Sequence, residues 1–171
     1  MRLLIIISAF SLFSCKPTEK TAIEQNSVPK VETQEATVSS KIEFTILKEG
    51  TNSGFKTAEN KVINSTEEFS KIWKILFQNY METPPLPKVD FRAYSAILVT
   101  IGEQNSGGYT INVKSITASK TQEKVIVNTS IPGKSCMTTS VMTYPFQLIM
   151  LPKTNGQVSF EKKETTYECE K

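Results

Sequence analysis

Residues 95–114, SAILVTIGEQNSGGYTINVK, decide the fold. Their first part, 95–101, is a nearly unbroken apolar run rich in β-branched side chains, which is typical of a strand buried on both faces. The glycine-containing stretch 102–108 predicts a turn, because glycine adopts positive φ without a Cβ clash. Residues 109–114 then alternate apolar and polar side chains, as a half-buried strand does. We expect 95–101 and 109–114 to pair as antiparallel neighbours, the first of them central in its sheet.

Other runs on either side of this stretch predict further strands. Residues 42–47, 61–64, 124–129, 143–151 and 158–160 are short, apolar or alternating, and bounded by turn residues. Pro145, near the start of its run, indicates an edge position or a bulge. Asn155-Gly156 is typical of a type I′ hairpin turn, which predicts that 143–151 pairs with 158–160.

One amphipathic helix is expected between the second and third predicted strands. Ser65-Thr66-Glu67-Glu68 matches a capping box, and the apolar residues that follow lie on one helical face: Phe69, Ile72, Trp73, Leu76 and Phe77. We expect Trp73 to lie in the core, and the helix to end before the stiff proline-rich connector 84–87. The predicted fold is α+β and mostly antiparallel, a compact sandwich-like sheet of six or seven strands with one packed helix.

The N-terminal 40 residues predict where in the cell the protein is located. After Met1-Arg2, the apolar run 3–13 has about 11 residues, whereas a membrane-spanning helix needs about 20. Residues 12–15, LFSC, resemble the lipobox of bacterial lipoproteins, which implies cleavage after Ser14 and lipid attachment at Cys15. An ordinary signal peptide with an incidental cysteine is the alternative. We expect a lipoprotein signal peptide at 1–14, a flexible polar tether at 15–40 and a globular domain at 41–171.

The expected location is the bacterial cell envelope. Lys16 does not resemble the aspartate that retains some lipoproteins in the inner membrane. This residue therefore favours the outer membrane, on either its periplasmic or its surface face.

Composition argues against several functions. The formal net charge is +3, and only Arg2 and Arg92 among the 20 basic residues are arginines, so we expect no nucleic-acid partner. The chain has no histidine, which excludes Ser-His-Asp and Cys-His catalysis and most zinc sites. Asp90 is its only aspartate, and Glu103 is expected to be a solvated turn residue. We expect no catalytic residue, metal or cofactor; a hydrolase that uses a glutamate or Cys136 is an alternative.

The two remaining cysteines are expected to pair. In the predicted hairpin, Met142 lies opposite Cys169, and Cys136 precedes Met142 by six residues. Both thiols would then lie near one end of the hairpin, and in an exported protein this favours a structural disulfide. Two free thiols, one of them reactive, are the alternative.

Two motifs resemble a known family. Residues 102–109, with Ser106-Gly107-Gly108-Tyr109, and residues 143–153, TYPFQLIMLPK, resemble the PrcB C-terminal family, over about 44–160. That family is named for a lipoprotein subunit of a bacterial surface protease complex. The resemblance implies a non-catalytic accessory role in the assembly or stability of an exported protease, with this protease or another envelope protein as partner.

Two binding functions remain open from the sequence. Besides the accessory role, a protease-inhibitor-like β domain would present 102–108 or 132–142 to a protease. For either function, the candidate contact residues are Ser106, Gly107, Gly108 and Tyr109, and the alternative is that they only shape a turn.

Overall fold

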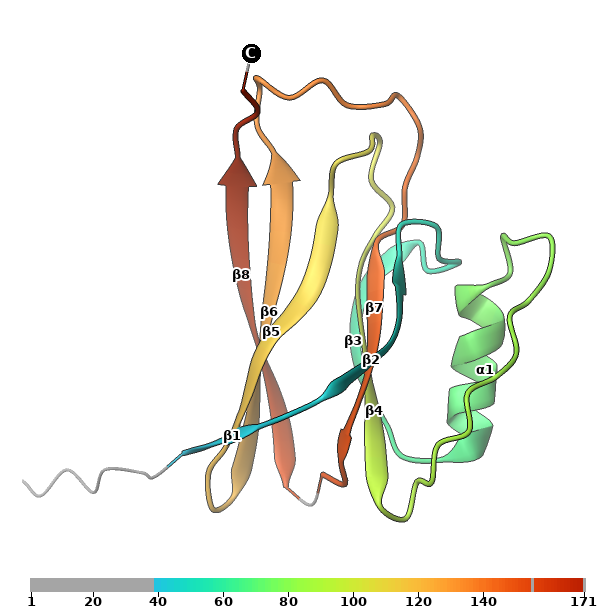
Figure 1. Cartoon of the computed structure of the whole chain (residues 1–171), viewed down its shortest axis with the longest axis vertical. Coiled ribbons are helices and arrows are strands. Elements are labelled where there is room, and N and C mark those ends of the chain that lie inside the picture. The colour runs from blue at the N-terminus through green and yellow to red at the C-terminus, as the bar shows by residue number, and fades with distance from the viewer. Residues whose placement is uncertain (1–38, 155, 171) are drawn as a thin grey trace, which may run out of the picture. The chain divides into compact units, whose positions relative to one another are not determined.

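A computed structural model describes residues 39–154 and 156–170, which form eight strands and one α-helix (Figure 1). In chain order these are β1 (Ser40–Ile42), β2 (Thr45–Gly50), β3 (Thr57–Ile63), α1 (Thr66–Leu76), β4 (Tyr94–Gly102), β5 (Thr110–Ala118), β6 (Gln122–Pro132), β7 (Phe146–Pro152) and β8 (Gln157–Tyr167). The strands make two four-stranded sheets, ordered β1-β5-β6-β8 and β2-β7-β4-β3. All pairs are antiparallel except β6 with β8. The predicted α+β sandwich is confirmed, with eight strands instead of six or seven.

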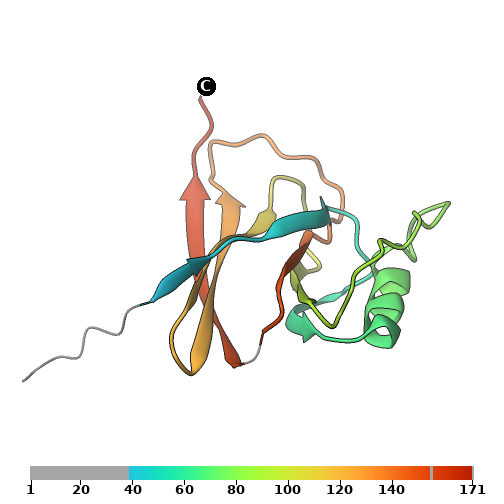
Figure 2. The same ribbon diagram turned by 60° about the horizontal axis from the view of Figure 1, so that its bottom comes forward.

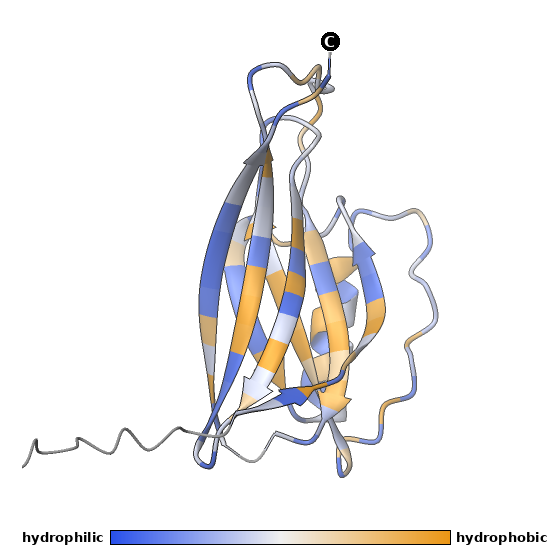
Figure 3. Cartoon of the chain, turned by 60° about the vertical axis from the view of Figure 1, so that its left-hand side comes forward, coloured by the Kyte–Doolittle hydropathy of each residue, from blue (hydrophilic) through white to orange (hydrophobic). Residues whose placement is uncertain are grey.

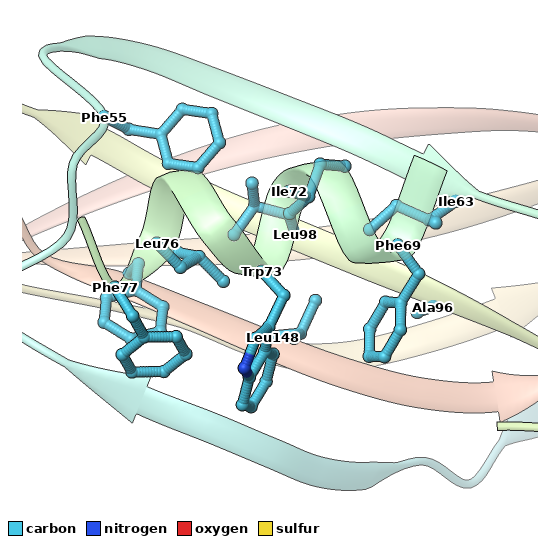
Figure 4. Packing of buried hydrophobic residues seen from close by; sticks show 11 residues of the cluster. Phe55, Ile63, Phe69, Ile72, Trp73, Leu76, Phe77, Ala96, Leu98 and Leu148 are labelled. Atoms are coloured by element: carbon cyan, nitrogen blue, oxygen red, sulfur yellow. The ribbon is translucent and has the colours of Figure 1, made fainter. Parts of the chain in front are cut away.

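The sheet β2-β7-β4-β3 is the middle of three layers. One face of this sheet packs against the other sheet, and the apolar core between them includes Val99, Val113 and Ile149. Between its other face and α1 lies a second core, shown in Figure 4. Colouring by hydropathy shows apolar residues along the strands of both sheets (Figure 3). Burial on both faces explains why the two interior strands of this middle sheet, β4 and β7, read as nearly continuous apolar runs.

β4 is central, as predicted, but its partners are not. It pairs with β3 on one side and β7 on the other, and residues 96–99 are fully buried. The predicted pairing of 95–101 with 109–114 is wrong, because β4 already has two neighbours and β5 lies in the other sheet. The chain leaves the sheet at Gly102, where φ is +72°. A Cβ at this position would lie 2.7 Å from the Lys56 carbonyl oxygen, so only glycine fits without strain.

The predicted hairpin at 155–156 is also wrong. β7 lies between β2 and β4, whereas β8 runs parallel to β6 in the opposite sheet. Asn155 itself lies outside the described residues. β7 is an interior strand, not an edge strand, and it tolerates Pro145 because the strand begins one residue later. Hydropathy patterns identify strands but do not choose between two sheets that share one core.

The N-terminal strand is divided. The run 42–47 was expected to form one strand, but its start belongs to β1, paired with β5, and its end to β2, paired with β7. Glu43 and Phe44 connect the two, and Phe44 packs against the core between the sheets. Ile42 also packs against that core, whereas Leu47 packs against the core beside α1, so the two halves of the run serve different cores.

The helix is confirmed in place and in orientation. The Ser65 hydroxyl accepts a hydrogen bond of 3.2 Å from the Glu68 amide, which caps the first turn. The predicted apolar face is buried, and it consists of Phe69, Ile72, Trp73, Leu76 and Phe77. Trp73 lies in the core, and its indole N–H donates to the Pro84 carbonyl over 2.8 Å. This bond anchors the proline-rich connector against the helix.

Several predictions lie outside the described residues. These are the signal peptide at 1–14, lipid attachment at Cys15, and all but the last two residues of the tether at 15–40. Within the part of the chain that the structure describes, no helix has the length and hydrophobicity of a membrane span.

Candidate functional site

Two loops lie at one end of the two sheets. The β4–β5 loop (103–109) and the β6–β7 loop (133–145) each cross from one sheet to the other, at the end where the C-terminus lies (Figures 1 and 2). They are joined by a short bridge, in which Gln104 and Thr143 exchange backbone hydrogen bonds of 2.8 and 2.9 Å. The two stretches that carried the family resemblance therefore contact each other.

The predicted contact residues of the β4–β5 loop hold the β6–β7 loop in place. The Gly107 amide donates to the Thr139 carbonyl over 3.0 Å, and the Thr143 hydroxyl donates to the Ser106 carbonyl over 2.8 Å. Gly108 has φ of +90°, and its carbonyl accepts a 2.9 Å hydrogen bond from the Tyr167 hydroxyl. These bonds give the glycine turn a structural role; its contact with a partner stays a prediction.

Tyr109 differs from the other three, because it lines a cleft between the sheets. This cleft has a volume of about 220 Å³ and opens between the edge strands β3 and β8. Its walls include Asn60 from β3, Thr129 from β6, and Lys162 and Glu164 from β8. Residues of opposite charge thus line one wall, on the side of β8.

The β6–β7 loop is tied to the C-terminal segment. Cys136 and Cys169 form a disulfide with a Cα–Cα distance of 4.8 Å. Next to it, the Glu168 carboxylate accepts hydrogen bonds from the Ser135 amide, over 3.2 Å, and from the Ser135 hydroxyl, over 2.5 Å. These two bonds lower the pKa of Glu168 below its ordinary value. The Ser135 hydroxyl oxygen in turn accepts a hydrogen bond from the Cys169 amide over 2.9 Å.

The predicted disulfide is present. However, it arises from a strand pairing that differs from the predicted hairpin. β6 and β8 are parallel neighbours, so their carboxyl ends, Pro132 and Tyr167, lie side by side. Cys136 and Cys169 lie four and two residues after these ends. The parallel pair, and not a hairpin, brings the two sulfur atoms together.

A further hydrogen bond links the start of the β4–β5 loop to the end of the β6–β7 loop. The Tyr144 hydroxyl donates to the Glu103 carboxylate over 3.0 Å. This bond raises the pKa of the Tyr144 phenol, because losing its proton would place two negative charges together. Glu103 is exposed, and its side chain serves here as a hydrogen-bond acceptor for the neighbouring loop.

A comparison with known protein families matches the part of the chain that contains both loops. Residues 95–152 match the family model described as PrcB C-terminal. The match confirms the resemblance predicted from the two motifs, over a narrower range than 44–160. No curated protein and no solved structure matches the chain.

The PrcB C-terminal match ends before the last strand, β8. It spans β4 to β7 and includes both loops, but it excludes β8 and hence Tyr167 and Cys169. The disulfide and the Glu168 carboxylate therefore connect the β6–β7 loop inside the match to the C-terminal segment after β8, outside it. Among the described residues, no group of three or more acidic, cysteine or histidine side chains could hold a metal ion.

The PrcB C-terminal segment also presents a feature that the predicted site residues did not include. On the β6–β7 loop, the Met137 side chain is fully exposed, and Val141 and Met142 are 60% and 52% exposed. The sequence signal is present in retrospect, because 135–152 contains no charged residue. The sequence leaves 132–142 open as a presented loop, and the fold shows that Met137, Val141 and Met142 are the apolar side chains that this loop exposes.

Proposed function

We propose that this chain is a lipid-anchored, non-catalytic accessory protein of a bacterial cell envelope, which assists the assembly or stability of an exported protease. The observation that carries the proposal is the PrcB C-terminal match over 95–152, since the resemblance to that family implies such a role. The lipobox-like residues 12–15 support the anchor, and Lys16 favours the outer membrane.

Association with a protease is tested by capture. The full chain, carrying a C-terminal affinity tag, is expressed in its own cells, the envelopes are crosslinked, and the captured proteins are identified by mass spectrometry. We expect an exported protease to be captured with the wild-type chain. Capture of no exported protease would contradict the proposal.

The anchor is tested by the mass of the mature polypeptide. We expect it to begin at Cys15 and to carry a diacylglyceryl group on the sulfur and a fatty acid on the amine. The Cys15→Ala variant should leave the membrane fraction. An unmodified Cys15 thiol, or residues 1–14 still attached in the wild-type chain, would exclude the lipoprotein.

Protease inhibition is a second candidate, favoured by one observation. Met137 is fully exposed on a loop that the Cys136–Cys169 disulfide fixes at its start, and a rigid exposed loop can occupy a protease cleft. An inhibitor reduces the hydrolysis rate of its target in stoichiometric proportion, whereas an accessory subunit preserves or raises it. A rate assay with the captured protease therefore separates the two functions.

A thiol hydrolase is disfavoured by the same disulfide. Cys136 bonded to Cys169 has no free thiol to act as a nucleophile. Labelling with a thiol reagent should therefore require prior reduction, and Cys136→Ser should leave any co-purifying hydrolytic activity unchanged.

A further inference from the structure

Residues 136–142 of the β6–β7 loop carry three apolar side chains that are exposed to water. Met137 is fully exposed, and Val141 and Met142 are more than half exposed. Between them lie only Thr138, Thr139 and Ser140, which are small and uncharged. Exposed apolar groups gathered on one segment, in contrast to single ones scattered over a surface, mark sites of protein contact.

This loop is held at its start, middle and end. The disulfide and the bonds to Glu168 fix Cys136 and Ser135. The Gly107 amide holds the Thr139 carbonyl from below, over 3.0 Å. Near the end of the loop, the Tyr144 amide donates to the Thr51 carbonyl over 2.7 Å. Because the backbone is already ordered, binding through this loop loses little conformational entropy.

The charge pattern indicates what such a loop binds. No charged residue occurs in 135–152, whereas Lys134, Glu103 and Glu168 lie at the borders of the loop. An uncharged apolar centre with a charged border is the usual anatomy of a protein interface. Methionine suits the centre, since its unbranched thioether adapts to the shape of an apolar pocket.

We infer that residues 136–142 are the surface through which the chain binds its protease partner, with the Met137 side chain inserted into an uncharged, apolar pocket of that protein. This inference rests on the proposed function and adds to it the contact surface and the chemistry of the partner's site. The disulfide and the glycine turn act by presenting the loop.

A competing apolar surface lies at the end of α1. Met81 is also fully exposed there, with Ile75 and Leu86 partly exposed nearby in sequence. However, Glu82 follows Met81 directly, and the segment lies outside the PrcB C-terminal match. The β6–β7 loop lies wholly inside that match. Because the match is what implies a protease partner, this loop is the better candidate for the surface that binds it.

Met81 provides a matched control for the test. Three full-length variants are compared with the wild-type chain in crosslinked envelopes: Met137→Glu, Met137→Leu and Met81→Glu. Because both methionine side chains are fully exposed, all variants should keep the wild-type melting temperature. The yield of co-captured exported protease is measured relative to the tagged chain.

We expect Met137→Glu to reduce the yield at least tenfold, since a carboxylate would be buried in an apolar pocket without a partner. Met137→Leu and Met81→Glu should retain the wild-type yield within a factor of two. If Met137→Glu retains the yield, or Met81→Glu loses it instead, the inference is wrong and the proposed function stands. If the wild-type chain captures no exported protease, the proposed function fails and the inference fails with it.

Discussion

The side-chain oxygen of Gln147 accepts a 2.8 Å hydrogen bond from the backbone amide of Val113. Gln147 belongs to β7 and Val113 to β5, so the bond joins the two sheets across their shared core. The Gln147 side-chain nitrogen donates to the Glu49 carboxylate over 2.7 Å, which fixes the orientation of the amide. With only 2% of its surface exposed, Gln147 is a polar link inside an apolar layer.

This link should contribute to stability. In Gln147→Leu the Val113 amide loses its acceptor in a buried position, which costs about 1–3 kcal/mol of unfolding free energy. Urea denaturation followed by tryptophan fluorescence measures the change. Glu49→Gln keeps an acceptor for the Gln147 nitrogen, and it should cost less than about 1 kcal/mol. Equal stability of Gln147→Leu and the wild-type chain would show that the link does not stabilise the fold.

The disulfide should stabilise the domain by restricting its unfolded chain. Cys136 and Cys169 are 33 residues apart, and a loop of this size predicts a loss of about 2–4 kcal/mol when both are replaced by serine. Reduction of the wild-type protein should lower its free energy of unfolding, measured by urea denaturation, by the same amount. A double variant with unchanged stability, or one that reduction destabilises further, would contradict this account.

Gly102 should resist substitution. Its φ of +72° and the 2.7 Å approach of the Lys56 carbonyl leave no room for a Cβ, so Gly102→Ala should cost about 1–3 kcal/mol. Gly156→Ala is the comparison, since a Cβ there would lie 3.1 Å from the Thr121 carbonyl without positive φ. The order of the two thermal midpoints checks the prediction; a Gly102→Ala domain as stable as Gly156→Ala would refute it.

The sequence predicts the elements of this fold better than their partners. The helix is evident from Ser65 and the stripe that begins at Phe69, because capping and 3.6-residue periodicity are local properties. The burial of 95–101 on both faces follows from its composition. Strand partners are not local: β4 and β5 are adjacent in the chain but lie in different sheets, and β8 pairs in parallel with β6.

The candidate site shows the same division. Ser106, Gly107 and Gly108 are recognisable as a turn, and the structure shows which loop that turn supports. A loop at 132–142 is one of the alternatives that the sequence leaves open, but the sequence does not show which side chains of that loop are exposed, and Met137 is not among the predicted contact residues. The structure adds that Met137 is fully exposed where the β6–β7 loop crosses between the sheets.

Acid should loosen the attachment of the C-terminal segment to the β6–β7 loop. The Ser135 hydroxyl and amide hold the pKa of Glu168 below its ordinary value of 4.5. A carboxyl group with a lowered pKa in the folded state stabilises that state above about pH 4.5, and this contribution disappears as the pH falls through the lowered pKa. At neutral pH the two hydrogen bonds are therefore fully formed.

The amide of Ser135 reports this change directly. In an NMR titration its chemical shift should move with a midpoint below pH 4.5, and hydrogen exchange of the Ser135 and Cys169 amides should accelerate over the same range relative to residues of β4. Glu168→Gln should abolish the titration while keeping an acceptor for Ser135. A midpoint at or above pH 4.5 would show that the carboxylate is not held by these bonds in solution, so that the disulfide and the hydrogen bonds of the Cys169 and Gly133 amides join the loop to the C-terminal segment without it.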